Sequence, residues 1–214
     1  MVCVPVPSGI ARGVALAGVL LSFASSAWAD RIAFLPSARK ISMTEARAEW
    51  LFSSGNKGTG RGSFGIGLGP SFEVEIEAQR PTGQGWLGSL SFSYNYLEPL
   101  KDMIPGLAAG FRDVLNRTPE GRVFFACVTY ASSTDNLFGS ITPVDLTLGV
   151  QTGRASGAYV GVSLPFSDAF QVVAEADRRQ ITGGLRIQPL RGFRAQVLIR
   201  RTETYWGLSY SIRF

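Results

Sequence analysis

Apolar and polar residues alternate along most of this chain, and this period of two constrains the fold more than any other feature. The clearest stretch is 72–79, where four apolar residues alternate with Glu73, Glu75, Glu77 and Gln79. A period of two fits β-strands and not helices. Similar segments return from Thr44 to the last residue, separated by turns containing Gly, Pro, Ser and Asp, which predicts about twelve strands of roughly nine to eleven residues. Two of them, 107–111 and 123–130, are expected to be strands although they alternate poorly.

Alternation alone leaves open a soluble β-sandwich and a membrane β-barrel, which differ in which face meets the surroundings. Charged residues make up only 17% of the chain and the mean hydropathy is +0.14, so the apolar face is large. An even strand number is typical of single-chain bacterial barrels. Aromatic residues near strand ends suit the two membrane interfaces: Trp50, Trp86, Tyr94, Tyr96, Tyr159, Tyr205, Trp206 and Tyr210. We therefore predict an all-β fold, an antiparallel up-and-down transmembrane barrel.

The last strand ends in alternating hydrophobic residues, Tyr210, Ile212 and the terminal Phe214. This ending resembles the C-terminal recognition signal of bacterial outer-membrane barrels. The resemblance implies recognition by the barrel-assembly machinery and residence in outer-membrane lipid.

The first 29 residues have the features of a cleaved secretory signal peptide. Arg12 precedes a short apolar run, and Ala27-Trp28-Ala29 forms a small-residue cleavage site. We predict a signal peptide at 1–29, a barrel domain at 30–214 and a location in the cell outer membrane. Cys127 is then the only thiol, so no internal disulfide is expected.

Composition excludes several function classes. The chain has no histidine, which removes Ser-His and Cys-His nucleophile pairs and His-containing zinc sites. The formal charge of +5 carries no long run of one sign, so nucleic acid is not an expected partner. We predict a non-enzymatic protein without catalytic residues, metal or cofactor.

If the apolar faces point to lipid, the charged residues of the opposite faces line the lumen. The predicted lumen charges are Glu45, Glu49, Glu73, Glu75, Glu77, Asp145, Glu175, Arg186, Arg194, Arg200 and Arg213. Acidic residues dominate the early strands and basic residues the late ones, so the two meet where the barrel closes. Two alternatives follow, a narrow charged conduit or an ion-pair network that fills the lumen. Three glutamates on one strand would need another segment to hold Ca²⁺.

Two short motifs resemble the YjbH-type outer-membrane proteins associated with exopolysaccharide production. The first is Leu35-Pro36-Ser37-Ala38-Arg39, and the second is Gly110-Phe-Arg112-Asp113, followed by Asp145-Leu-Thr-Leu-Gly149 and Gly153-Arg154. The motif residues are Pro36, Ala38, Arg39, Arg112 and Asp113. For Arg112 and Asp113 we consider a local charge pair or an anchor for a turn.

The resemblance implies a barrel with a role in exopolysaccharide and cell-envelope biogenesis, as a scaffold or narrow conduit. It implies exopolysaccharide or periplasmic export proteins as partners. Members of that family are several times longer, so functions of their additional regions do not transfer. The alternative function is a soluble periplasmic β-sandwich that binds a glycan or a protein.

Overall fold

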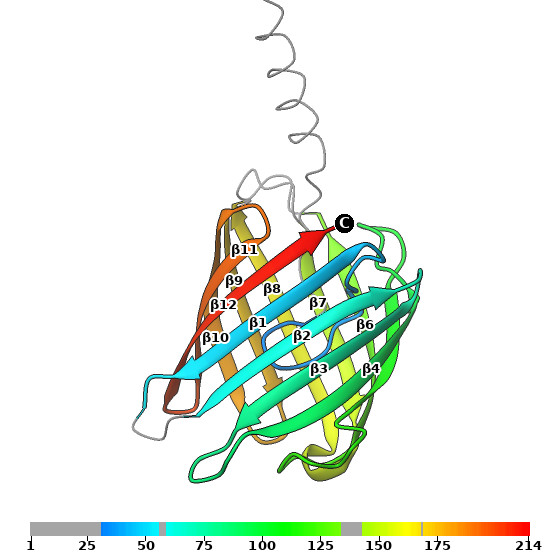
Figure 1. The fold of residues 1–214 in the computed structure, drawn as a ribbon. Helices are drawn as coiled ribbons and strands as arrows, with labels where there is room; N and C mark the ends of the chain where they lie inside the picture. The colour runs from blue at the N-terminus through cyan, green and yellow to red at the C-terminus, as the bar shows by residue number, and fades with distance from the viewer. Residues whose placement is uncertain (1–30, 56–58, 134–142, 168) are drawn as a thin grey trace, which may run out of the picture.

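A computed structural model describes residues 31–55, 59–133, 143–167 and 169–214 and shows one closed antiparallel barrel (Figure 1). This confirms the predicted fold class and the number of strands. The strands are β1 Glu45–Ser53, β2 Gly60–Leu68, β3 Phe72–Arg80, β4 Leu87–Leu97, β5 Gly106–Arg112, β6 Val123–Ser132, β7 Val144–Gln151, β8 Gly157–Ser167, β9 Phe170–Asp177, β10 Ile181–Leu190, β11 Phe193–Arg200 and β12 Glu203–Arg213. The predicted signal peptide lies outside the described residues.

The barrel closes by pairing of β1 with β12, from Glu45 opposite Arg213 to Ser53 opposite Tyr205. The Phe214 N–H adds a hydrogen bond to the Thr44 carbonyl at 2.9 Å. Every other strand pairs with its neighbours in sequence. No strand of the described barrel therefore has an unpaired edge, which removes the usual route to edge-to-edge aggregation.

The period of two places apolar side chains outside and polar ones inside. Trp50, Phe64 and Ile76 are exposed on the outer surface, whereas Glu75, Thr147 and Gln171 are buried in the interior. A single sheet closed on itself, with a polar interior, is the inverse of a soluble sandwich. The alternative of a soluble β-sandwich was wrong, because the twelve strands form one closed sheet and not two packed sheets.

Alternation is poor in β5 and β6 because their inward faces are also largely apolar. Ala108, Val123, Phe125 and Cys127 point inward and are buried. These segments are strands as predicted. The connection after β4, residues 98–105, lies at the end of the barrel that carries the C-terminus, where Asp102 N–H donates to the Ala131 carbonyl at 2.8 Å.

Residues 31–44, which we call the lumen segment, run inside the barrel before β1 begins (Figure 1). Ile32, Phe34, Leu35, Ala38 and Ile41 are all buried. The described residues contain no helix long and apolar enough to cross a bilayer. The interior of the barrel is thus occupied by the chain itself, which the alternation of the strands did not predict.

Two of the aromatic residues expected at the membrane interfaces lie inside instead. Tyr159 is buried in the lumen, and its hydroxyl donates to the Pro36 carbonyl at 3.3 Å. Tyr205 packs edge-on against Phe34, with ring centroids 5.5 Å apart. Both residues occupy inward positions of their strands, so their assignment to the outer surface was wrong. Trp50, Trp86, Tyr94, Tyr96, Trp206 and Tyr210 are exposed.

Candidate functional site

The lumen segment begins with a tight turn that its own backbone stabilises. The Ile32 N–H donates to the Leu35 carbonyl at 3.1 Å, and Arg31 pairs with Pro36 as an isolated bridge. This turn satisfies one peptide N–H and leaves the N–H groups of residues 33–35 available to the barrel wall. The wall must supply acceptors for them, because a buried peptide group without a partner is costly.

Glu175 of β9 supplies those acceptors. Its carboxylate accepts hydrogen bonds from the backbone N–H groups of Ala33, Phe34 and Leu35 at 3.0 to 3.1 Å. Consecutive N–H groups that converge on one anion form a nest-like site, and hydrogen bonds to an ionised acceptor are the stronger kind. On the opposite side of the turn, the Ile32 carbonyl accepts a hydrogen bond from Arg186 of β10. The turn is therefore held by buried charges of two adjacent strands.

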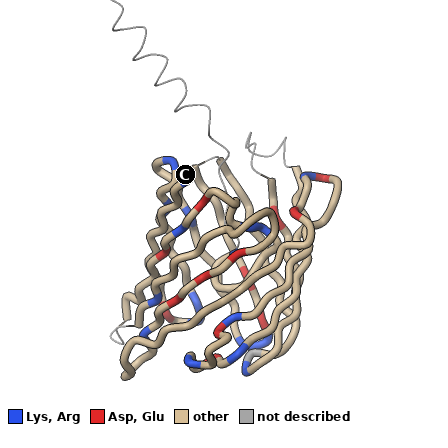
Figure 2. The backbone as a smooth tube through the Cα atoms, turned by 45° about the vertical axis from the view of Figure 1, so that its right-hand side comes forward, with Lys and Arg blue, Asp and Glu red and all other residues tan. Residues whose placement is uncertain are grey.

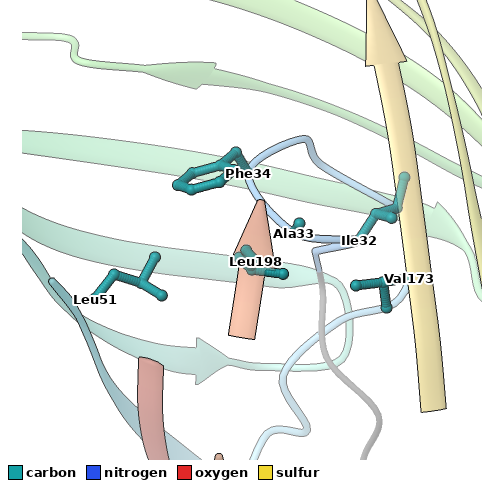
Figure 3. Close-up of a cluster of buried hydrophobic side chains, with 6 residues drawn as sticks. All are labelled: Ile32, Ala33, Phe34, Leu51, Val173 and Leu198. Carbon is teal, nitrogen blue, oxygen red and sulfur yellow. The ribbon is translucent and has the colours of Figure 1, made fainter. Parts of the chain in front are cut away.

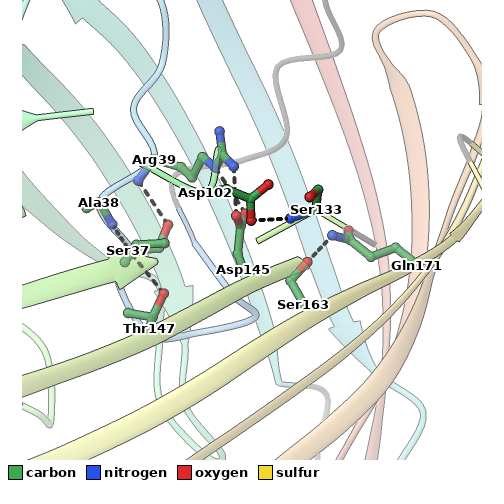
Figure 4. Close-up of polar contacts among 10 residues, drawn as sticks. Ser37, Ala38, Arg39, Asp102, Ser133, Asp145, Thr147, Ser163 and Gln171 are labelled. Atoms are coloured by element: carbon green, nitrogen blue, oxygen red, sulfur yellow. Dashed lines mark hydrogen bonds and ion pairs between the residues drawn. The ribbon is translucent and has the colours of Figure 1, made fainter. Parts of the chain in front are cut away.

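A second set of contacts holds the part of the lumen segment nearer the C-terminal end of the barrel (Figure 4). Arg39 forms a two-pronged ion pair with Asp145 of β7, with Nε and Nη2 at 3.0 and 2.7 Å from the two carboxylate oxygens. The Ala38 N–H donates to Thr129 Oγ1 at 2.8 Å, and Thr129 is hydrogen bonded to Thr147. These polar contacts fix the backbone in register with β6 and β7.

Apolar contacts fill the space between the polar ones. One cluster joins Ile32, Ala33 and Phe34 to the inward-facing Leu51, Val173 and Leu198 (Figure 3). A second cluster joins Leu35 and Ala38 to Ala108, Phe125, Cys127 and Tyr159. Apolar groups at inward positions of a membrane barrel are otherwise unexpected. They are present here because they contact the lumen segment.

Glycines at inward positions make room for the segment. A Cβ at Gly161 would overlap the side chain of Ile32, and one at Gly65 would come within 2.7 Å of Ile41 Cδ1. At Gly67 a Cβ would meet the backbone of Ile41 and Ser42. The wall is thus recessed where the segment passes.

The Glu73, Glu75 and Glu77 ladder of β3 is occupied by protein donors. Glu73 accepts from the Ile41 N–H at 3.2 Å, Glu75 pairs with Arg31, and Glu77 pairs with Arg61 at 2.7 Å. Arg47 also approaches Glu75, at 4.0 Å. Acidic and basic positions are interleaved over the wall (Figure 2). The ladder thus holds the lumen segment and neighbouring strands.

The remaining predicted lumen charges also lie on the inner face. Glu49 accepts from Gln196 at 2.8 Å, and Arg186 contacts the same glutamine. Arg194 is buried, and the Arg200 guanidinium lies 4.4 Å from the Phe34 ring centre. Glu45 and Arg213 are 3.6 Å apart across the seam, with Arg213 half exposed at the rim.

The structure separates the two residues of the second family-like motif, Arg112 and Asp113. Arg112 of β5 donates to the Phe34 carbonyl at 3.4 Å and to Gln151 at 2.8 Å. Asp113 accepts from the N–H groups of Arg117 and Thr118 at 2.9 and 2.6 Å. Asp113 is therefore an anchor of the turn after β5, and Arg112 instead reaches the lumen segment.

A cavity of about 180 Å³, lined in part by Phe34, lies at the end of the barrel opposite the C-terminus. We call it the vestibule. Its walls include four arginines and three carboxylates: Arg61, Arg80, Arg112 and Arg200, with Glu77, Asp113 and Glu120. The Nε atoms of Arg112 and Arg200 are buried without a hydrogen-bond acceptor. Glu77 and Asp113 are already engaged by Arg61 and by the backbone of the turn after β5, so the arginines in excess favour an anionic occupant.

The residues of the C-terminal signal lie on the outside. Tyr210 and Ile212 are exposed on β12, and Phe214 is 72% exposed at the end of the strand. Their contact with the lumen segment is the backbone hydrogen bond from the Phe214 N–H to the Thr44 carbonyl. Their conformation suits contact with lipid or another protein better than packing within the barrel.

Sequence reasoning missed the lumen segment because residues 31–44 show no alternation. A signal was nevertheless present in the strands. Leu51, Phe125, Val173 and Leu198 occupy positions whose strand neighbours two residues away are largely polar or small. Apolar residues at such positions indicate that something apolar occupies the lumen.

Comparison with known proteins supports the fold. No protein-family model and no curated protein matches the chain. Two solved structures of the KdgM porin, one in complex with disordered oligogalacturonate, are similar to it with a TM-score of 0.52 and 11% identity, over 79% of this chain and 99% of that chain. The outer membrane protein Omp33 of Acinetobacter baumannii has a TM-score of 0.48 and 11% identity, over 80% of this chain and all of that chain. The barrel is thus porin-like in its fold.

Proposed function

We propose that this protein is a non-enzymatic outer-membrane barrel that its own lumen segment closes, and that it acts as a scaffold for cell-envelope exopolysaccharide. The observation that carries the proposal is the set of hydrogen bonds from Ala33, Phe34 and Leu35 to Glu175. They place ordered backbone across the passage that a porin of this fold would leave to solutes.

Membrane insertion is supported by the outer surface. Large apolar side chains such as Leu148, Val150 and Ile199 are more than half exposed there, a surface that would be unstable in water. The exposed C-terminal signal, Tyr210 to Phe214, would meet the barrel-assembly machinery. The signal peptide at 1–29 would deliver the chain to the periplasm, and both termini of the barrel would then face that side.

A closed state is supported by the diversity of the contacts that hold the segment. They combine the Glu175 carboxylate, the Arg39–Asp145 pair and two apolar clusters. So many contacts fix the segment in one position, whereas a flexible gate would be held by fewer contacts that can be broken. A narrow charged conduit would require the lumen segment to move out of the barrel. We therefore propose that the resting protein is a closed scaffold and not a conduit.

The association with polysaccharide is supported by the vestibule and by the motif resemblance. Four arginines line the vestibule, and guanidinium groups suit the carboxylate of an acidic sugar. The KdgM porin, which has the same kind of fold, was solved with oligogalacturonate. Among the residues that resemble the YjbH-type motifs, Pro36, Ala38 and Arg39 belong to the lumen segment, and Arg112 donates to it at Phe34. Periplasmic export proteins are the proposed partners at the end of the barrel that carries the C-terminus.

Two measurements test the proposal. Heat-modifiable migration of the protein from outer-membrane fractions would demonstrate a folded membrane barrel, and recovery in the soluble periplasm would contradict it. In planar bilayers we expect no steady conductance from the intact protein. A stable open current at all voltages would contradict the closed scaffold and restore the conduit.

Binding to sugar is a separate measurement. We expect oligogalacturonate to bind the folded protein in detergent and neutral maltooligosaccharide not to bind. We expect Arg200→Gln to weaken binding by about tenfold or more, since hydrogen bonds to charged groups are the strong ones. Arg201→Gln is the matched control, because Arg201 lines an outer groove and not the vestibule. Equal binding of acidic and neutral sugars would contradict an acidic ligand.

A further inference from the structure

A groove of about 850 Å³ runs down the outside of the barrel over β9, β10 and β11, at the end opposite the C-terminus. Its sides include Val172, Ile181, Leu185 and Ile199. These are outward positions, and Ile181 is 72% exposed. An apolar groove of this kind faces the lipid if the barrel spans a membrane.

Gly183 forms the floor of the groove. A Cβ placed on it would have its nearest neighbour, the Val173 carbonyl oxygen, 4.0 Å away. The backbone around Gly183 is ordinary strand, so neither a positive φ nor a close approach requires glycine there. The missing side chain therefore leaves a recess between apolar neighbours without relieving any strain in the barrel.

Three arginines stand at the mouth of the groove. Arg178 and Arg179 belong to the turn after β9, and Arg201 belongs to the turn after β11. The nearby Asp177 carboxylate accepts the backbone N–H groups of Arg179 and Gln180 at 2.7 and 2.8 Å. Arg201 Nη2 donates to the Arg179 carbonyl at 3.0 Å, which ties the two turns together. With three arginines and one carboxylate that already holds the turn, the mouth carries an excess of positive charge.

Guanidinium groups bind phosphate oxygens with two parallel hydrogen bonds and are preferred for phosphate recognition. A cationic mouth that continues into an apolar recess matches a molecule with an anionic head and a hydrocarbon tail. A soluble acidic sugar would use the arginines but would gain nothing from Ile181, Leu185 and Ile199. Charge and apolar surface together select a lipid.

We propose that this groove binds a phosphorylated lipid of the outer leaflet, with the phosphate at Arg178, Arg179 and Arg201 and an acyl chain over Gly183. The proposal rests on membrane insertion with the termini at the periplasmic side, which places this end of the barrel in the outer leaflet. It does not depend on whether the lumen is closed or on what the vestibule binds.

The test titrates the folded full-length protein in a neutral detergent with diphosphorylated lipid A and with the same lipid after removal of both phosphates, and counts bound lipid by native mass spectrometry. We expect the phosphorylated form to bind at least about tenfold more tightly. The double variant Arg178→Gln, Arg179→Gln should lose that preference. Arg154→Gln is the matched control, since Arg154 lies at the same end but outside the groove and donates to Pro119.

Gly183→Leu tests the acyl part, because it fills the recess with little disturbance to the sheet. We expect weaker binding of both lipid forms. Heat-modifiable migration of each variant reports whether the barrel is folded, so failure of the barrel is distinguishable from failure of the site.

Two results would overturn the proposal. Equal binding of both lipid forms by the parent protein would exclude recognition of phosphate. Displacement of the lipid by inorganic phosphate alone, together with unchanged binding by Gly183→Leu, would identify a phosphate site that does not use a lipid chain.

Discussion

Replacing Glu175 is expected to release the lumen segment from the barrel wall. The carboxylate accepts three consecutive backbone N–H groups, and the wall around it is apolar at Val173 and Leu198. In Glu175→Gln one oxygen remains as an acceptor. The other is replaced by an NH₂ group, which is a donor and cannot accept a hydrogen bond from the backbone N–H groups. The three N–H groups all bond the same oxygen, Oε2, so the glutamine carbonyl can keep them only as neutral hydrogen bonds. Exchange of three charge-assisted bonds for neutral ones, at roughly 1 kcal/mol each, weakens docking by about 3 kcal/mol. The displaced population should then rise about a hundredfold.

Thiol labelling measures that population. In a Cys127→Ser background, Ala33→Cys places a single thiol at a position whose parent side chain is 3% exposed. The rate of modification by a membrane-impermeant reagent should rise about a hundredfold when Glu175→Gln is added, because labelling occurs only in the displaced state. Planar bilayer recordings should show brief openings in the same variant.

Glu49→Gln is the matched control. Glu49 is also a lumen carboxylate, but it accepts from Gln196 on the wall and no described contact joins it to residues 31–44. Its labelling rate should equal that of the parent protein. If Glu175→Gln and Glu49→Gln both label like the parent, or if both label equally faster, the reasoning that Glu175 holds the segment is refuted.

Four further predictions concern other parts of the molecule. Gly161→Val should displace the lumen segment by overlap with Ile32, and Ile32→Ala should restore slow thiol labelling; the absence of rescue would contradict direct contact. Arg39→Gln and Asp145→Asn should each speed labelling, and the double variant should add little to either, since a double-mutant cycle reports their coupling. The pKa of Asp102 lies below its ordinary 3.8 because of hydrogen bonds from Ser133, so the contact between the two connections at the C-terminal end should persist above the depressed pKa and be lost as the pH falls through it; an NMR titration should find this pKa raised in Ser133→Ala. Phe214→Ala should reduce the amount of barrel assembled in cells while barely changing the unfolding midpoint of the assembled protein, because the ring is largely exposed; equal assembly would contradict the C-terminal signal.

The strands were predictable because alternation reports directly which face meets lipid. Even β5 and β6 were located, although Phe125 and Cys127 obscured their pattern. The path of residues 31–44 was not predictable in this way. Its backbone N–H groups donate hydrogen bonds to side chains far away in sequence, such as Glu175. Every residue except proline has the same backbone N–H, so the sequence does not indicate which acceptor each one reaches.

The charged lumen was predictable as a set of residues but not as a set of pairs. The early acidic and late basic residues were expected to meet where the barrel closes, and Glu45 does lie 3.6 Å from Arg213 across the seam. The carboxylates of β3 have other partners: Glu75 meets Arg31 of the lumen segment, and Glu77 meets Arg61 of the adjacent strand. Pairing depends on which segment crosses the interior, and so it could be assigned only once the segment was placed.

The lumen segment is continuous with β1, the strand that seals the barrel against β12. This connection sets an order of events during biogenesis. Once the last strand has joined the first, the turn at Phe34, with Arg31 and Arg39 on either side, would have to thread through a closed ring to reach its place. The segment should therefore enter a still open sheet, where Glu73, Asp145 and Glu175 can bind it one after another. Because the lumen segment precedes every strand of the barrel in the chain, it would then act as an internal template, which brings distant strands to their final curvature before the last one arrives.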